Sequence, residues 1–172
     1  NHQKNNIKVA EKLYNDILKD NPNHFESIFL LGTLSAQSKK FDMAKQLLNK
    51  AIQIKPDFVD AHNNLGNVLI ELEEYQEAKN YCQKAIQIQP DFVAAHNNLG
   101  VVFKKLGELQ KAKKCYEKAI EIQPNHLDAL NNLGNILKDL GDFQKAVSCY
   151  EKAIQIDSNY AVAHYNIGKA LE

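Results

Sequence analysis

The sequence predicts an all-α solenoid of about ten helices, built from helix pairs stacked in series. The segment from Ala61 to Asn67 returns at residues 95–101 and 129–135, and more weakly at 163–169, so the chain repeats every 34 residues. All four prolines and five of the seven glycines keep the same spacing. Apolar residues between them recur with the period of an α-helix. A fixed period of this length is typical of repeat arrays, which bury apolar faces between neighbouring repeats and have no single central core.

The expected elements follow in chain order. Residues 5–20 carry one apolar stripe and predict a helix with no partner before it, which ends ahead of Pro22. The first helix of each later pair is expected near residues 25–38, 59–72, 93–106 and 127–140. The second is expected near 42–54, 76–88, 110–122 and 144–156. The last segment, 160–172, is a first helix whose partner is missing, with Ala163, Ile167 and Leu171 on its apolar stripe.

The predicted organisation is a single array over residues 1–172. It consists of an unpaired second-type helix in 1–24, full repeats at 25–58, 59–92, 93–126 and 127–160, and an unpaired first-type helix in 161–172. Gly107 and Gly141 should end two first helices by adopting positive φ. Asp42 and Asp142 stand where a second helix should begin and are suited to cap its free N–H groups.

Composition excludes several classes of function. The chain has 21 basic and 21 acidic residues, and every basic residue is Lys. A neutral chain without Arg is a poor nucleic-acid binder and a poor clamp for phosphate or carboxylate. Its three cysteines lie in helical segments, which predicts free thiols and a reducing, cytoplasmic location. No apolar run is long enough to span a membrane, and no signal peptide is visible.

The repeats resemble the tetratricopeptide repeat family. Repeat 93–126 carries the family's pattern of bulky, small and proline positions at His96, Leu99, Gly100, Phe103, Ala112, Tyr116, Ala119 and Pro124. Repeat 59–92 follows the same pattern, and so does repeat 127–160 except that Ser158 stands in place of proline. Repeat 25–58 departs from the pattern at Ser35, where a large residue is usual. The resemblance implies a right-handed array of antiparallel pairs whose first helices line a concave peptide-binding groove.

Four glycines fall in the middle of first helices, where Gly costs about 1 kcal/mol relative to Ala. Close approach of the second helix would compensate for this cost. The expected contacts are the alanines of the second helices. The glycines are Gly32, Gly66, Gly100 and Gly134, and the alanines are Ala44, Ala78, Ala112 and Ala146.

The polar stripe of the first helices predicts the binding residues. Asn64, Asn98, Asn132 and Asn166 share one register, in which Leu30 stands in the first full pair. Asn67 and Asn135 share a second register, with Thr33, Val101 and Lys169, and Asp60 and Asp128 share a third, with Glu26, Ala94 and Val162. Lys104, Lys105 and Lys138 form a positive cluster near the ends of two first helices, suited to a partner's acidic tail or simply to water.

The asparagine row resembles the ladder in the repeat domain of O-linked N-acetylglucosamine transferases, which implies that the amides hold the backbone of an extended peptide. An amide offers both a donor and an acceptor to a peptide group. Each such bond nets about 0.5–1.5 kcal/mol, so four would give only roughly millimolar binding. The alternative is that these amides bond to neighbouring helices and support the scaffold.

Catalytic and metal-binding patterns are not found in the sequence. His62, His96 and His164 are separated by multiples of 34, one per repeat, and no His-x-x-x-His pair occurs, so we expect partly buried histidines and no metal site. There is no phosphate loop, nucleophile elbow or Cys-x-x-Cys motif. The sequence therefore predicts a non-enzymatic module with no cofactor.

Three functions remain open from the sequence. The first is a module that binds an extended peptide or a partner helix in its groove. The second is the substrate-recruiting arm of a larger enzyme such as a glycosyltransferase. The third is a scaffold that self-associates through its terminal helices.

Overall fold

The structure is a computed structural model that describes residues 2–171, with side chains from residue 7 to residue 169. Every regular element in this range is an α-helix, as predicted. The helices are α1 (His2–Asp20), α2 (Phe25–Gln37), α3 (Phe41–Ile54), α4 (Val59–Glu71), α5 (Tyr75–Ile88), α6 (Val93–Lys105), α7 (Leu109–Ile122), α8 (Leu127–Asp139), α9 (Phe143–Ile156) and α10 (Ala161–Leu171). The eight helices from α2 to α9 begin and end within one residue of their predicted bounds. The side chain of Leu171, on the predicted stripe of α10, lies outside the described residues.

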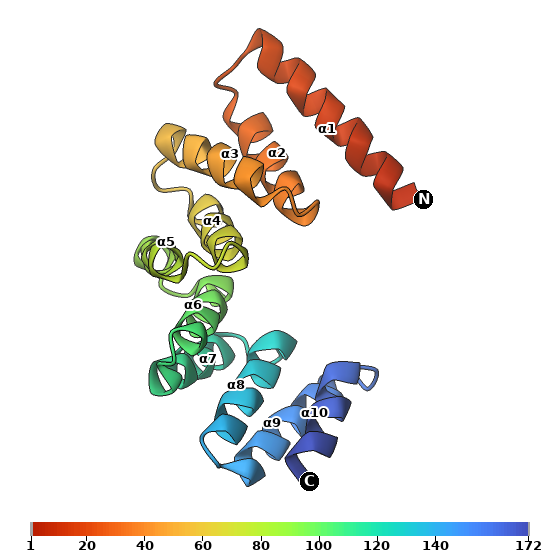
Figure 1. Cartoon of the computed structure of the whole chain (residues 1–172), viewed down its shortest axis with the longest axis vertical. Coiled ribbons are helices and arrows are strands. Elements are labelled where there is room, and N and C mark those ends of the chain that lie inside the picture. Colours follow the sequence, from red (N-terminus) through yellow and green to blue (C-terminus); the bar gives the residue numbers. More distant parts are fainter. Residues whose placement is uncertain (1, 172) are drawn as a thin grey trace. The chain divides into compact units, whose positions relative to one another are not determined.

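The chain divides into two compact units, and α1 to α5 make up the first, Asn1–Ile88. Within it α2 packs on α3 and α4 packs on α5, while α3 also contacts α4 and α1 covers α2 (Figure 1). A core cluster joins Phe25 and Ile28 of α2 to Ala51 of α3 and Ala61 of α4, and Leu18 of α1 packs against it. The apolar face of each helix is thus buried by its neighbours in the chain, as in a repeat array.

The second unit, Gln89–Glu172, repeats this arrangement with α6 to α10. Helix α6 packs on α7 and α8 packs on α9, and α7–α8 and α9–α10 contacts join the pairs (Figure 1). The first helices α6 and α8 also touch each other directly, as do α8 and α10. Because successive first helices are neighbours, equivalent residues on them form rows.

The mid-helix glycines make room for large side chains of the second helix. A Cβ atom built on Gly100 would collide with the ring of Tyr116, one on Gly134 would collide with Tyr150, and one on Gly66 would lie 2.7 Å from Cys82 Sγ. The side chain nearest to each of these glycines is therefore that of the residue four positions after the predicted alanine, and at Gly66 the Ala78 carbonyl oxygen also lies 3.6 Å from the added Cβ. The alanines are fully buried elsewhere in the same helix interface.

The turn between the helices of a pair uses a left-handed residue at one fixed register. Gly107 and Gly141 adopt φ of +77° and +82° there, as predicted. In the two preceding repeats the position holds Lys39 and Glu73, with φ of +58° and +60°. A side chain with a Cβ is less favourable than glycine in this conformation, so these two turns carry backbone strain.

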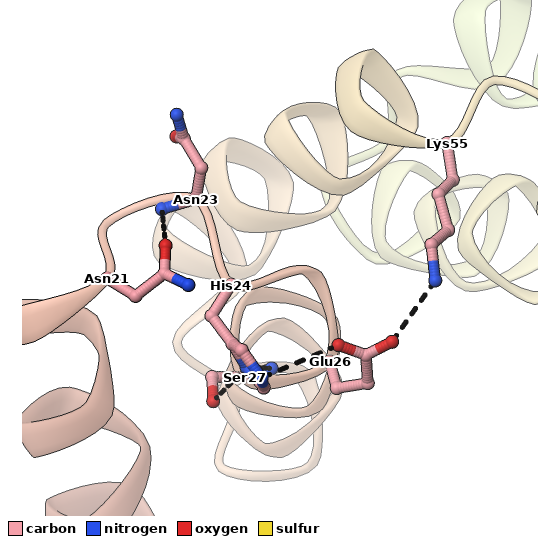
Figure 2. A network of polar contacts seen from close by, with 6 residues as sticks. All are labelled: Asn21, Asn23, His24, Glu26, Ser27 and Lys55. Carbon is pink, nitrogen blue, oxygen red and sulfur yellow. Dashed lines mark hydrogen bonds and ion pairs between the residues drawn. The ribbon is translucent and has the colours of Figure 1, made fainter.

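Helix caps differ from repeat to repeat. Asp142 caps α9 by accepting a hydrogen bond from the Lys145 N–H at 3.4 Å, as predicted. Asp42 does not cap α3, because that helix already begins at Phe41 and Asp42 lies in its first turn. His24 caps α2 instead of the usual Ser, Thr, Asp or Asn: its Nδ1 accepts from the Ser27 N–H at 3.3 Å (Figure 2).

Candidate functional site

All ten residues predicted for the site lie on first helices. Helix α4 carries Asp60, Asn64 and Asn67, and α6 carries Asn98 and Lys104. Helix α8 carries Asp128, Asn132, Asn135 and Lys138, and α10 carries Asn166. Their exposure is uneven, from the exposed Asn67 and Lys104 to Asn166, which is only 8% exposed. The residues of each unit are described in turn.

In the first unit, a pocket of about 240 Å³ opens between α2 and α4. Asn64 and Asn67 form its α4 side, and Thr33, Ala36 and Gln37 form its α2 side. Phe41, the first residue of α3, completes the lining. Two predicted site residues therefore share one concave surface with a neighbouring repeat.

A chain of hydrogen bonds fixes the orientation of the Asn64 amide in this pocket. Asn64 Nδ2 donates to Thr33 Oγ1 at 3.2 Å, and that hydroxyl donates to the Phe29 carbonyl at 3.0 Å. A primary amide has two N–H donors and a carbonyl acceptor, and this chain uses one donor. Asn64 thus ties α4 to α2 and is held in a defined direction at the pocket wall.

In the second unit, amide pairs link successive first helices. Asn132 Nδ2 donates to Asn97 Oδ1 at 3.1 Å, which joins α8 to α6. Asn166 Nδ2 donates to Asn131 Oδ1 at 2.8 Å, which joins α10 to α8. In both cases an amide of the predicted row donates to the first Asn of the Asn-Asn pair in the preceding repeat. These amides support the repeat stack, and their contact with a ligand stays a prediction.

Asn67 and Asn135 share a register but have different surroundings. The reason is that the second-helix side chain that faces the mid-helix glycine differs between their repeats. Tyr150 of α9 donates its hydroxyl to Asn135 Oδ1 at 2.9 Å, so this amide is engaged within its own repeat. Burial raises the pKa of Tyr150 to about 12. In repeat 59–92 the residue equivalent to Tyr150 is Cys82, which has no hydroxyl, and Asn67 is exposed at the pocket.

In repeat 93–126 the tyrosine that faces the glycine is Tyr116, and the register of Asn135 holds the apolar Val101. Tyr116 is fully buried, and its hydroxyl has no hydrogen-bond partner among the described residues. The residue equivalent to Asn135 is Val101, which offers no side-chain acceptor. Burial is also the main cause that raises the pKa of Tyr116 well above its ordinary value. This hydroxyl is a buried, unsatisfied polar group of the kind that destabilises a fold.

The acidic register lies near the beginning of the first helices. Asp128 is exposed and accepts a hydrogen bond from the Tyr160 hydroxyl at 3.2 Å, and Asp60 is half-buried. Glu26, the equivalent residue in α2, pairs with Lys55 at 3.1 Å and lies 3.7 Å from His24 Nε2 (Figure 2). The pKa of the Glu26 carboxyl is lowered. The larger cause is a hydrogen bond from its own backbone N–H, and the next is the hydrogen bond from Lys55. Two members of this row are therefore already paired with side chains of the same chain.

The predicted lysine cluster lies at the carboxyl ends of α6 and α8. Lys104 and Lys105 are exposed, and Lys138 is half-buried. Lys104 Nζ lies 3.8 Å from a carboxylate oxygen of Asp139, and both side chains are about two-fifths exposed. An ion pair of this length at a surface contributes little to stability, so Asp139 holds Lys104 only weakly, and contact of these lysines with a ligand stays a prediction.

Each of the three aligned histidines hydrogen-bonds to the turn before its own helix. His62 Nε2 lies 2.7 Å from the Pro56 carbonyl, His96 Nε2 lies 2.8 Å from the Pro90 carbonyl, and His164 Nε2 lies 2.9 Å from the Ser158 carbonyl. Because a carbonyl only accepts, each Nε2 carries the proton. Over the described part of the chain, no three His, Cys, Asp or Glu side chains gather into a metal-binding group. Among the described helices none is both long and apolar enough to cross a bilayer.

Sequence reasoning missed the α2 side of the pocket. Thr33 was aligned with Asn67 but was not assigned to the site, and Ala36, Gln37 and Phe41 were not considered. Gln37 lies one helical turn after Thr33, so the polar stripe of α2 was a usable signal for it. Phe41 belongs to a different helix, and only the packing of α3 brings it to the pocket.

Comparisons with known proteins agree with the helix-pair architecture. The family model described as tetratricopeptide repeat matches residues 57–125 and 91–159, which together span more than half of the chain. A second model, described as anaphase-promoting complex, cyclosome, subunit 3, matches residues 1–85. A search of curated proteins gave no match.

Solved structures resemble the chain over almost its full length. The crystal structure of MamA is 28% identical, covers 93% of this chain and 94% of its own, and superposes with a TM-score of 0.80. That of YrrB, described as a TPR protein with an unusual peptide-binding site, is 24% identical with a TM-score of 0.74, covering 95% and 84%. TTC0263 from Thermus thermophilus is 18% identical with a TM-score of 0.83, covering 99% and 93%. The chain therefore belongs to the tetratricopeptide repeat family.

Proposed function

We propose that this protein is a non-catalytic interaction module that binds an extended peptide along its first helices. The observation that carries the proposal is the concave, amide-lined pocket between α2 and α4. Pockets with a few well-placed polar groups are the usual form of a ligand site. YrrB, which resembles this chain, is described as having a peptide-binding site, and this supports the same class of ligand here.

The amide rows would contribute direction more than affinity. Asn132 and Asn166 each spend one N–H on a neighbouring repeat, so only part of each amide is left for a ligand. Each remaining hydrogen bond would net about 0.5–1.5 kcal/mol. Side-chain contacts in the pocket must therefore supply the rest of the binding free energy. Exposed Asn67 is the strongest single candidate for a direct contact.

Charges at the two ends of the first helices would orient the peptide. Asp60 and Asp128 lie in the first turns of α4 and α8, whereas Lys104 and Lys138 lie in the last turns of α6 and α8. Acidic residues of a ligand would be favoured near the lysines and basic residues near the aspartates. The Lys104→Ala and Lys138→Ala double variant should then lose affinity for an acidic peptide and become less sensitive to salt.

The test is titration of a peptide library against the wild type and two variants. Asn67→Ala removes an exposed amide, and the Asn64→Ala, Asn98→Ala, Asn132→Ala triple variant removes the row. Asn80→Ala is the matched control, because Asn80 is an exposed amide on the second helix α5. We expect weaker binding for the two site variants and no change for the control. Equal affinity of all four proteins for every peptide would rule out the amide rows as a binding surface.

The triple variant needs a stability measurement beside the titration, because it also removes the Asn64–Thr33 and Asn132–Asn97 hydrogen bonds. Asn67→Ala does not remove either bond. Agreement between the two variants therefore separates lost ligand contact from lost folding.

A second candidate role is self-association through α1 and α10. Val9 and Leu13 of α1 are more than half exposed, and so is Tyr165 of α10. No atom of the described residues lies within 4 Å of a Cβ built on Gly168, whereas the equivalent Gly134 is covered by Tyr150. On α10, the exposed Tyr165 and the uncovered Gly168 fit a helix of a second copy. Light scattering over a concentration series should show association that Tyr165→Asp abolishes, and a monomer at every concentration would contradict this role.

We also propose a cytoplasmic location. Cys115 and Cys149 are free thiols, which suits a reducing compartment. Imaging of a tagged protein in its native host tests this location.

A further inference from the structure

The pocket between α2 and α4 has an uncharged but strongly hydrogen-bonding lining. Three carboxamides and one hydroxyl line it, from Asn64, Asn67, Gln37 and Thr33. None of its six lining residues is charged, and Ala36 and Phe41 add apolar surface. Its volume of about 240 Å³ is large enough for one protruding side chain of a peptide but not for a folded partner.

The hydrogen-bonding capacity of this lining selects among ligand groups. The Thr33 hydroxyl is already engaged, since it accepts from Asn64 and donates to Phe29. Gln37 and Asn67 are exposed, and each carboxamide offers donors and an acceptor. A carboxylate would leave the amide carbonyls without a donor, and an ammonium group would leave the N–H groups without an acceptor. A primary carboxamide satisfies both kinds of group at once.

The equivalent positions of the second unit have different chemistry. Ala36 and Gln37 correspond to Lys104 and Lys105, and Thr33 corresponds to Val101. The amide equivalent to Asn67, that of Asn135, accepts a hydrogen bond from Tyr150. The neutral amide lining therefore belongs to α2–α4 and is replaced by lysines at α6–α8.

From these contacts we infer that the α2–α4 pocket is a subsite for an uncharged carboxamide side chain, Gln or Asn, of the bound peptide. The inference rests on the proposed peptide-binding function and specifies one residue type for it. The carboxamide of the ligand pairs with Gln37 and Asn67, while the Asn64–Thr33 bond holds the pocket wall in place. The methylene stem of the ligand packs on Phe41 and Ala36.

The experiment uses blocked tripeptides as probes and the full chain as receptor. Acetyl-Gly-Gln-Gly-amide is compared with the same peptide carrying Glu, Lys, Leu or Gly at the centre. Binding is followed by NMR on the side-chain NH₂ signals of Gln37, Asn64 and Asn67, which single substitutions assign. We expect the Gln probe to shift these signals and to bind about tenfold more tightly than the Glu or Leu probe, as two additional hydrogen bonds would give.

A variant that adds positive charge to the pocket lining provides the matched control. The Ala36→Lys, Gln37→Lys double variant installs the residues of the second unit and should reverse the preference from Gln to Glu. Gln37→Glu, a milder change, should weaken Gln binding and favour Lys. Either reversal supports the subsite, provided that the circular dichroism spectrum is unchanged.

Three results overturn the inference, and they differ in what they leave standing. If the Gly and Gln probes bind the wild type equally, the carboxamide subsite is wrong while peptide binding by the backbone stands. If longer peptides bind but none of the three NH₂ signals moves, the site of binding lies elsewhere. Failure of every peptide at every length would overturn the proposed function together with this inference.

Discussion

Tyr116 faces Gly100 and Tyr150 faces Gly134, so the same buried hydroxyl group occurs in two repeats with different surroundings. Tyr150 donates to Asn135 at 2.9 Å, whereas the Tyr116 hydroxyl is buried without a partner among the described residues. Replacing either tyrosine by phenylalanine keeps the ring over its glycine and removes only the oxygen. We therefore expect the two substitutions to have different effects on the free energy of unfolding.

The magnitudes follow from the partners of each hydroxyl. Tyr150→Phe should destabilise the protein by about 1 kcal/mol, the net value of a typical hydrogen bond. Tyr116→Phe removes an unsatisfied polar group whose burial costs on the order of 1–3 kcal/mol, so the variant should be neutral or more stable. Val101→Asn installs the equivalent of Asn135 beneath Tyr116 and should stabilise the protein by about 1 kcal/mol, an effect that Tyr116→Phe should cancel.

Urea unfolding, monitored by circular dichroism, measures these differences. The comparison holds when the dependence of the free energy of unfolding on urea concentration is the same in wild type and variant. For a chain of this length, about 1 kcal/mol corresponds to a shift of roughly 2–4 °C in the melting temperature. The reasoning is refuted if Tyr116→Phe and Tyr150→Phe lower stability equally. It is also refuted if Val101→Asn gives the same change in the wild type and in the Tyr116→Phe background.

Three further predictions concern the turns, the tyrosines and the thiols. Lys39→Gly and Glu73→Gly should each raise the free energy of unfolding by about 0.5–1 kcal/mol in urea titrations, because both residues have positive φ, whereas Gly107→Ala should lower it. Burial and the neighbouring Asp128 raise the pKa of Tyr160 to about 12, from an ordinary value of 10.0. Between pH 10 and 12 the unfolded chain loses this proton first, so stability should fall as pH rises, and Tyr160→Phe should make the fall shallower in melts at graded pH. Burial also raises the pKa of the Cys115 thiol to about 11, so it should react with iodoacetamide far more slowly at about pH 8 than a free cysteine does, and a rate equal to that of a model thiol would contradict its burial.

The sequence was a good guide where the repeat itself determines the structure. The period predicted the helix pairs, and Gly107 and Gly141 predicted the left-handed turns, because backbone propensity and apolar periodicity act over a few residues. It was a poor guide where two helices must be placed against each other. The contact opposite Gly100 required the direction in which Tyr116 points, and periodicity alone favoured the alanine one turn earlier.

The candidate site shows the same division. The asparagine register was visible in the sequence, but an amide can face a ligand or a neighbouring helix with the same spacing. Only the placed side chains reveal that Asn132 donates to Asn97 and that Asn64 donates to Thr33. The pocket combines residues from three helices, and Phe41 joins it through tertiary packing that no local pattern encodes.

The amide pairs between first helices have a consequence for how such a chain changes length. Asn97 and Asn131 are the same residue at the same register, and so are Asn132 and Asn166. Loss of residues 98–131 would join Asn97 directly to Asn132, and the fused helix, as long as α6 or α8, would still present an Asn oxygen to Asn166. Duplication or deletion of 34 residues between Asn97 and Asn132 therefore keeps this amide joint in register, so this part of the array can grow or shrink without losing the hydrogen bond between first helices.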